Sequence, residues 1–406
     1  MQKEKLVPAI RFKGFDKEYI TNKTIDILNI ERGASPRPIN NYLAKNGINW
    51  VKISDAPTTG YYITQTEDKI ITDGIKFSKR VFPGDLILSN SMSFGRPYIM
   101  GIPGCIHDGW LKITDIDNKF DSVYLCTLFG TEQMIKKYKS LAAGSTVNNL
   151  NKELVASTQI SYPAFEEQQK ISKFFSNLDS LIHLQELKLE NLQTIKQSLL
   201  DKMFALYDQK VPEIRFKGFD ESWKLNKFSD LYNCSNEKNI NIRYSEKNII
   251  SVANMYFKDE QKISNAEYLK SYNIFHLGDI AYEGNKSANY RYGRFVVNTI
   301  GSGIVSHVFE VFKPVMKEYD LYFWKYYINS ESIMRNVLRD STKSTTMMAT
   351  LVKKDLSNQF IKITSIAEQQ KIGQFFSSLD SIIHYQEQKL EKINNLKQAL
   401  LEKMFC

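Results

Sequence analysis

The sequence contains one unit twice, and this repeat restricts the possible folds more than any other feature. Residues 8–16 (Pro-Ala-Ile-Arg-Phe-Lys-Gly-Phe-Asp) recur as residues 212–220 with a single substitution. Residues 167–204 recur as residues 368–405, and about two-thirds of the paired positions are identical. The chain is therefore predicted to be a duplicated unit, in which a variable domain precedes a segment of nearly constant sequence.

Each of the two nearly constant segments is predicted to form one long helix. Apolar residues recur at three- and four-residue steps from Ile171 to Met203, and again from Ile372 to Met404. No Pro or Gly interrupts residues 166–204. A helix of about 38 residues is about 57 Å long and needs a partner for its apolar face. We expect the two helices to pack antiparallel as a coiled coil, related by a pseudo-two-fold axis.

The variable domains have a different pattern, which predicts an α+β fold for each. Short β-rich runs such as residues 85–88 and 308–312 alternate with turn residues, and helical stretches follow near residues 122–138 and 321–338. The predicted domains are residues 1–164 (first variable domain), 165–205 (central helix), 206–365 (second variable domain) and 366–406 (C-terminal helix).

The positive charge is concentrated in the two variable domains. Residues 1–165 hold 21 Lys+Arg and 16 Asp+Glu (+5), and residues 206–365 hold 23 and 18 (+5). Residues 166–205 sum to −1 and residues 366–406 to 0, which gives the total of +9. Two separate basic blocks favour a polyanionic partner that contacts both domains, although charge by itself is also typical of a merely basic protein.

Several classes of protein are disfavoured by composition. No apolar run reaches the length of about eighteen residues that a membrane span needs, and the N-terminus lacks a signal-peptide core. The four cysteines (Cys105, Cys126, Cys234, Cys406) have no CxxC spacing, which argues against a zinc module or a disulfide framework. We expect a cytoplasmic protein.

Catalytic motifs are also missing from the sequence. It has no GxxxxGK[ST] phosphate loop, no HExxH or HxxxH pair and no Asn/Asp-Pro-Pro-aromatic segment of the kind found in amino-methylating DNA enzymes. These observations predict that the chain is not an enzyme and binds no metal.

The repeated segments carry a family resemblance. Residues 165–171 (Phe-Glu-Glu-Gln-Gln-Lys-Ile) and residues 367–372, each followed by a Phe-Phe pair and Leu-Asp, resemble the helical region of specificity subunits of type I restriction-modification systems. Pro83-Gly84-Asp85 and Leu277-Gly278-Asp279 look like that family's motif at the start of a strand. Residues 144–154 resemble its loop before the helix, whereas residues 344–348 of the second copy lack the matching Gly and Asn.

The resemblance implies a function and a set of partners. Each variable domain would be a target-recognition domain that reads one half of a bipartite DNA target. The helices would set the spacing between the halves and dock two methyltransferase subunits, and motor-nuclease subunits would complete the restriction enzyme. S-adenosylmethionine would bind to the methyltransferase subunits and not to this chain.

Loops that can enter a DNA groove are expected to supply the base contacts, because bases are read by polar side chains. The predicted DNA-binding residues of the first domain are Ser35, Arg37, Asn90, Ser91, Ser93, Arg96, His107 and Ser145. Those of the second domain are Asn285, Lys286, Ser287, Arg291, Tyr292, Arg294, His307, Lys343 and Ser344. The predicted partner-docking residues are Phe174, Phe175, Phe375 and Phe376, for which packing in the helix seam is an equally good interpretation.

Two other functions remain open from the sequence. An autonomous sequence-specific DNA-binding protein would use the same two domains without partners. A stand-alone DNA-modification enzyme with an unrecognised site would bind the methyl donor itself.

Overall fold

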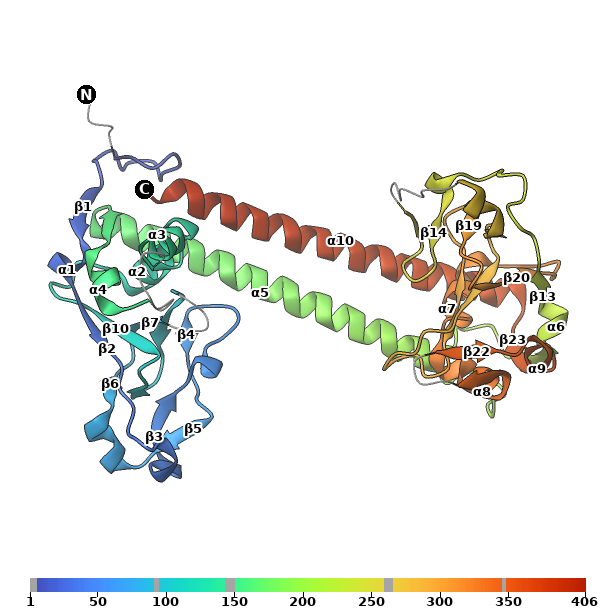
Figure 1. Cartoon of the computed structure of the whole chain (residues 1–406), viewed down its shortest axis with the longest axis horizontal. Helices are drawn as coiled ribbons and strands as arrows, with labels where there is room; N and C mark the ends of the chain where they lie inside the picture. Colours follow the sequence, from blue (N-terminus) through green and yellow to red (C-terminus); the bar gives the residue numbers. More distant parts are fainter. Residues whose placement is uncertain (1–5, 91–94, 143–149, 259–265, 345–347) are drawn as a thin grey trace. The chain divides into compact units, whose positions relative to one another are not determined.

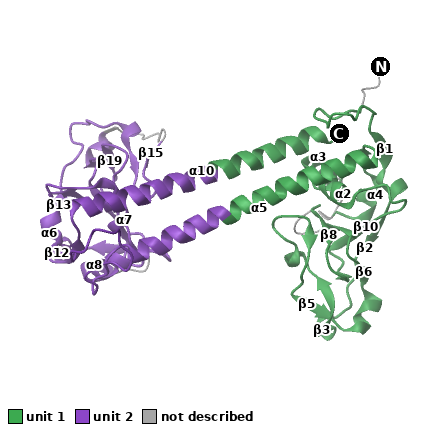
Figure 2. Ribbon diagram, turned by 180° about the vertical axis from the view of Figure 1, so that it is seen from behind, with its two compact units in different colours: residues 1–187, 388–406 green, residues 188–387 purple. Residues whose placement is uncertain are grey.

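The computed structural model divides into two compact units. It describes residues 6–90, 95–142, 150–258, 266–344 and 348–406, although the side chains of Ala142, Ala266 and Ser344 are not described. Unit 1 comprises residues 1–187 and 388–406, and unit 2 comprises residues 188–387 (Figure 2). Both units mix sheets with helices, so the predicted α+β class is confirmed (Figure 1).

Unit 1 is built around a five-stranded sheet. The sheet order is β2 (Leu28–Arg32), β10 (Trp110–Asp115), β7 (Leu86–Ser89), β8 (Pro97–Met100) and β4 (Tyr62–Ile63). A second sheet has the order β5 (Asp68–Ile70), β3 (Leu43–Val51), β9 (Gly104–Ile106) and β6 (Lys79–Val81), and β1 (Ile20–Lys23) pairs with β11 (Gln159–Tyr162). Strand β7 is buried on both faces, because Leu86 and Leu88 pack into one hydrophobic cluster and Ile87 into another. This double burial explains its uninterrupted apolar sequence.

Unit 2 repeats this topology with smaller sheets. Its main sheet has the order β13 (Tyr232–Ser235), β20 (Glu310–Pro314), β17 (Ile280–Glu283) and β18 (Arg294–Val297). Four strand pairs are also present among the described residues of the unit: β12 (Lys224–Lys227) with β23 (Phe360–Ile363), β14 (Ile250–Ser251) with β15 (Tyr256–Phe257), β16 (Asn273–Phe275) with β19 (Gly303–Val305), and β21 (Thr342–Ser344) with β22 (Ala349–Leu351). The order β13-β20-β17-β18 corresponds strand for strand to β2-β10-β7-β8.

Short helices occupy matching places in the two units. They are α1 (Thr24–Ile27), α2 (Ser122–Phe129), α3 (Glu132–Ala142) and α4 (Lys152–Ser157) in unit 1, and α6 (Phe228–Leu231), α7 (Leu321–Tyr327), α8 (Glu331–Ser341) and α9 (Lys353–Ser357) in unit 2. The predicted helical stretches at residues 122–138 and 321–338 are therefore each divided in two. Asp121 caps α2 by accepting hydrogen bonds from Val123 and Tyr124, and Asp320 caps α7 by accepting one from Phe323.

The two predicted long helices are confirmed as α5 (Phe165–Lys202) and α10 (Ile366–Met404). In unit 1, Lys397 of α10 pairs with Asp179 of α5, and Phe405 packs on Phe175. In unit 2, Lys196 of α5 pairs with Asp380 of α10 at 2.5 Å. Within unit 1, the earlier residue of α5 (Phe175) contacts the later residue near the end of α10 (Phe405), so these helix segments run antiparallel. No described helix combines the length and apolar composition of a membrane span.

The repeated nine-residue motif fastens each variable domain to a long helix. Arg11 forms two hydrogen bonds with the buried Glu167 of α5, at 2.8 and 2.7 Å, and Arg215 forms the same pair with Glu368 of α10, at 2.7 and 2.8 Å. Glu167 and Glu368 are 1% and 0% exposed. A charge this deeply buried is stable only when its partner is present, which explains why the motif recurs almost unchanged.

Candidate nucleic-acid interface

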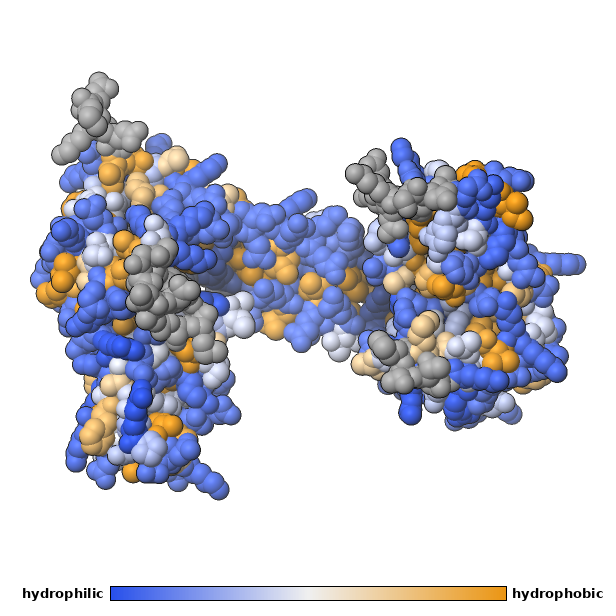
Figure 3. Space-filling model, in the orientation of Figure 1, coloured by the Kyte–Doolittle hydropathy of each residue, from blue (hydrophilic) through white to orange (hydrophobic). Residues whose placement is uncertain are grey.

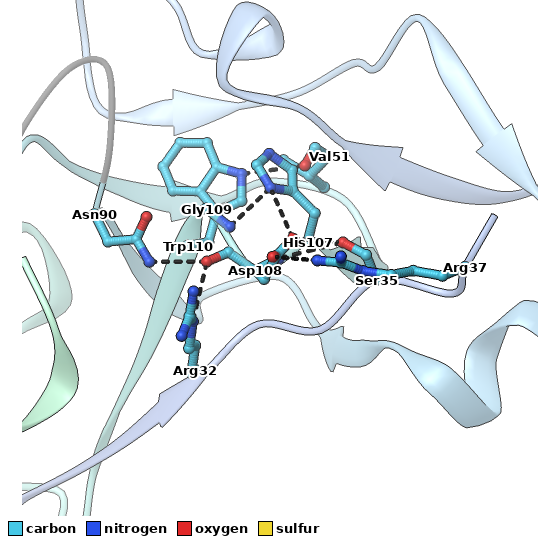
Figure 4. A network of polar contacts seen from close by, with 9 residues as sticks. All are labelled: Arg32, Ser35, Arg37, Val51, Asn90, His107, Asp108, Gly109 and Trp110. Atoms are coloured by element: carbon cyan, nitrogen blue, oxygen red, sulfur yellow. Dashed lines mark hydrogen bonds and ion pairs between the residues drawn. The ribbon is translucent and has the colours of Figure 1, made fainter. Parts of the chain in front are cut away.

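Polar side chains from three loops lie together at one end of strands β2, β10 and β7 in the five-stranded sheet of unit 1. Strand β10 lies between β2 and β7 and runs antiparallel to both, with Leu111 opposite Arg32 and Trp110 opposite Ser89. The last residues of β2 and β7 therefore lie beside the first residues of β10. This register brings Ser35, Arg37 and Asn90 close to residues 107–109 (Figure 4).

Asp108 is the centre of this polar network. Its carboxylate accepts a hydrogen bond from Ser35 Oγ at 2.7 Å and one from Arg37 Nη2 at 3.1 Å. Its backbone oxygen accepts hydrogen bonds from Asn90 Nδ2 at 2.8 Å and from Arg32 Nε at 3.3 Å. The hydrogen bond from Ser35, together with backbone bonding and the nearby Arg37, lowers the pKa of Asp108, so the carboxylate is ionised at neutral pH.

His107 lies beside the network and is partly buried, with 22% of its side chain exposed. Its Nδ1 accepts a hydrogen bond from the Gly109 amide at 2.8 Å, and burial lowers the pKa of the imidazole, which favours the neutral form. A Cβ at Gly109 would lie 2.2 Å from the His107 ring, and one at Gly33 would lie 1.9 Å from the His107 carbonyl oxygen. Position 33 therefore requires glycine because the overlap is with backbone, whereas a side chain at position 109 would displace the His107 ring.

Four of the predicted contacts in the first domain thus come together: Ser35, Arg37, Asn90 and His107. Arg96 is exposed but is held by its own unit, because Nη2 donates to the Thr58 carbonyl at 2.5 Å and the guanidinium lies 5.2 Å from the centre of the Tyr98 ring. Ser91, Ser93 and Ser145 lie outside the described residues.

Arg32 is not among the residues that the sequence predicts to bind DNA, and Asp108 is a candidate only as the neighbour of His107. The sequence signal for Asp108 is its position beside His107, just ahead of a predicted strand. The contact with Ser35 depends on strand pairing between segments about seventy residues apart, which no local pattern reveals. Three-dimensional register was therefore needed to identify the centre of the site.

In unit 2, the loop that corresponds to the loop after β7 in unit 1 follows β17 and begins at Gly284. A Cβ at Gly284 would lie 2.4 Å from the carbonyl oxygen of Ala349, so this close approach of two backbones requires glycine. Among the predicted contacts, Asn285, Ser287 and Arg291 are exposed, whereas Lys286 and Tyr292 are partly buried. The Tyr292 carbonyl accepts a hydrogen bond from Tyr282 Oη at 2.7 Å, which fastens the loop to the sheet.

Arg294 is committed to contacts inside unit 2. Its Nε donates to Glu283 Oε2 at 2.7 Å, Nη2 donates to the Ala253 carbonyl at 3.1 Å, and the guanidinium lies 4.9 Å from the centre of the Tyr290 ring. The side chain is 21% exposed. In the chain by itself Arg294 therefore stabilises the loop, and its role in DNA binding stays a prediction.

The remaining predicted DNA contacts of unit 2 are His307, Lys343 and Ser344. Strand register makes His307 the counterpart of Asp108, because Phe312 lies opposite Ile280 as Ile113 lies opposite Leu86. His307 is exposed and lies edge-on to the ring of Tyr268, with 6.3 Å between the ring centres. Lys343 is exposed on β21, and the side chain of Ser344 is outside the description.

The four phenylalanines predicted to dock a partner differ in burial. Phe175 and Phe376 are fully buried. Phe174 and Phe375 are partly buried and pack edge-on against Phe12 and Phe216, with 5.9 and 5.8 Å between ring centres. Adjacent positions on a helix point about 100° apart, which separates the two members of each pair.

Other apolar side chains of the long helices are exposed at positions that recur in both repeats. Figure 3 shows hydrophobic side chains at the surface of these helices. The pairs, with their exposed fractions, are Leu181 and Ile382 (41% and 51%), Leu184 and Tyr385 (61% and 68%), and Ile195 and Leu396 (50% and 53%). Unit 1 therefore presents Leu181, Leu184 and Leu396, and unit 2 presents the equivalent three.

No three His, Cys, Asp or Glu side chains gather as metal ligands would within the described part of the chain. The four cysteines are unpaired thiols, and Cys105 and Cys126 are buried.

These features define a class of protein that is built from a duplicated module. Each module contains a sheet with polar loops at one end of its strands, and it is attached to a long helix. Residues 17–194 match the model of the type I restriction modification DNA specificity domain. This match confirms the resemblance to type I specificity subunits that the repeated segments carry.

Known proteins support the same grouping. The type I restriction enzyme MjaIX specificity subunit of Methanocaldococcus jannaschii is 27% identical over 232 residues, which are 55% of this chain and 54% of that protein. The chain thus spans about half the length of the curated relatives it matches.

Solved structures extend the likeness in fold to nearly the whole chain. The S subunit of a type I restriction-modification system from M. genitalium aligns over 98% of this chain and 99% of its own, with a TM-score of 0.56 and 12% identity. A chain from a structural study of complex assembly in a type I R-M system aligns over 96% and 98%, with a TM-score of 0.59 and 13% identity.

Proposed function

We propose that this chain is the sequence-specific DNA-recognition subunit of a type I restriction-modification complex and has no catalytic centre of its own. The observation that carries the proposal is the polar network around Asp108. It lies at the strand ends of the sheet in the part of the chain that matches the DNA specificity domain. Arg37 in this network is 79% exposed and can meet another molecule. Each target-recognition domain, with the boundaries 1–164 and 206–365, reads one half of a bipartite target.

Electrostatics supports a double-stranded DNA partner. Residues 1–165 and residues 206–365 each carry a net charge of +5, whereas residues 166–205 and 366–406 sum to −1 and 0. Lys and Arg that neutralise phosphates release counterions, so binding by such a protein weakens steeply as salt rises. Base contacts then come from the exposed loops, with Ser35, Arg37, Asn285 and Arg291 as the best-placed side chains.

The outward apolar positions of the long helices are proposed to dock two methyltransferase subunits. The same three positions are exposed in both repeats, so two copies of one partner can bind in equivalent ways. Of the four predicted docking phenylalanines, Phe174 and Phe375 are the pair that a partner can contact, because Phe175 and Phe376 have no exposed surface. Motor-nuclease subunits and S-adenosylmethionine belong to the assembled complex, with the methyl donor on the methyltransferase subunits.

Methylome mapping tests the proposal. Cells that carry the methyltransferase subunits are compared with and without this chain. The expected result is a two-part methylated motif that appears only when the chain is present. A methylome that is unchanged by the chain contradicts the proposal, and stoichiometric binding of S-adenosylmethionine to the isolated chain contradicts its non-catalytic role.

A further inference from the structure

The Asp108 carboxylate uses its two oxygens for two different residues of one loop. Oδ1 accepts from Ser35 Oγ, and Oδ2 accepts from Arg37 Nη2. The two contacts together fix the direction in which the Arg37 side chain leaves the loop. An exposed ion pair of this kind contributes only about 0–1 kcal/mol to stability, so holding the unit together does not explain it. The Arg37 and Asp108 side chains are 79% and 38% exposed.

Asp108 is itself held in place by its surroundings. Asn90, which is 6% exposed, donates to its backbone oxygen, and the glycines at 33 and 109 allow the backbone of residues 107–109 to approach its neighbours. The network therefore exists before any ligand binds. A side chain held in one orientation loses less conformational entropy on binding than a free one.

The two repeats agree in their framework and differ at this position. The buried pairs Arg11–Glu167 and Arg215–Glu368 are identical in both units. The counterpart of Asp108 is His307, which lies beside Tyr268. A position that reads DNA is expected to differ when the two half-sites differ.

We propose that Asp108 is a positioning residue that aims Arg37 at a guanine of the half-site read by unit 1. The inference rests on the proposed function. The Arg37 Nη2 atom is held by Asp108, and the guanidinium has other donors that can reach guanine O6 and N7 in the major groove. Arginine is the side chain that recognises guanine most often, because its planar fork matches these two acceptors.

The test uses the assembled methyltransferase complex on duplexes in which each guanine of the target is replaced, one at a time, by 7-deazaguanine, which lacks the N7 acceptor. The wild-type complex is expected to lose on the order of ten- to a hundred-fold in methylation efficiency at one guanine of one half-site. With Arg37→Ala, replacement at that same guanine should cause no further loss. With Asp108→Asn, sensitivity at that guanine should fall while every other guanine keeps its wild-type response.

Two further variants separate positioning from misfolding. Arg37→Lys keeps the charge but loses the planar fork, so it should behave like Arg37→Ala at the sensitive guanine. Asp117 forms a surface ion pair with Lys119 in the same unit, and Asp117→Asn should leave the whole pattern unchanged.

The outcomes are distinguishable. If the wild-type complex methylates no two-part motif, the proposed function itself is contradicted. If the complex is active but Asp108→Asn keeps full sensitivity at every guanine, or no guanine depends on Arg37, the inference is overturned and the proposed function stands.

Discussion

The buried ion pairs of the repeated motif make the sharpest prediction for single residues. Replacing Arg215 by Met leaves Glu368 buried without its main partner, so unit 2 should lose about 3–5 kcal/mol of unfolding free energy. The double variant Arg215→Met/Glu368→Leu should recover most of this loss, because no uncompensated charge remains. Urea denaturation of the three proteins measures both effects. Equal stability of the single and double variants would contradict the assignment.

Asp279 makes a prediction about pH. It is 3% exposed, and burial raises its pKa to about 6, although hydrogen bonding to the His276 amide and the charges of His276 and Lys313 oppose the rise. Its counterpart Asp85 pairs with Lys112 at 2.7 Å, whereas strand register puts Val311 at the equivalent place in unit 2.

A folded-state pKa above the unfolded value favours the neutral acid, so the stability it provides is lost as pH rises through about 6. Asp279→Asn should therefore stabilise unit 2 by about 1–3 kcal/mol near pH 7.5 and by much less near pH 4. Thermal unfolding at the two pH values checks this. A gain of the same size at both values would show that titration of Asp279 is not responsible.

At the scale of elements, the long helices combine a buried seam with an outward apolar surface. Phe376 is fully buried and stacks on Phe204, with 5.8 Å between ring centres. Phe376→Ala should destabilise unit 2 by about 3–5 kcal/mol, measured by chemical denaturation. A loss below about 1 kcal/mol would place Phe376 outside the core.

Substitutions at the outward apolar positions should weaken partner binding and leave the stability of the chain nearly unchanged. Leu184→Asp combined with Tyr385→Asp should change the unfolding free energy by less than about 0.5 kcal/mol, because both side chains are mostly exposed. The variant should nevertheless fail to copurify with the methyltransferase subunits. Lys392→Asp, at an exposed position of α10, is the matched control. Normal copurification of the double variant would rule out this docking surface.

The long helices could be predicted from the sequence, whereas their exposed positions and the contacts of the loops could not. The apolar period and the repeat predict both long helices and their partnership, because these signals are local or lie in the duplicated sequence. The same period also includes Leu181, which is 41% exposed, since an apolar residue within a helix does not reveal whether the facing surface is another helix or a separate protein. The loops are less predictable: Arg294 looks like a DNA contact from its place after a strand, but it pairs with Glu283 across two neighbouring strands.

In the whole molecule, the length of the long helices is expected to set the gap between half-sites. Inserting four helical residues near Gln193, with a matching insertion near Asn394, lengthens each helix by about 6 Å and turns it by about 400°. Because one base pair spans about 3.4 Å, the spacer should grow by about two base pairs while both half-sites stay the same. Methylome mapping of the variant checks this, and an active variant with the original spacer contradicts a ruler.

Each repeat is proposed to read its own half of the target. The most direct test of this proposal is the methylome of cells in which residues 206–365 of the chain are replaced by a second copy of residues 1–164, expressed with the methyltransferase subunits. The framework contacts of the repeated motif are the same in both units, so the exchanged domain should fit the long helices. The expected result is a methylated motif that contains the half-site of unit 1 twice and has lost the half-site of unit 2. A motif that still contains the original second half-site would contradict it.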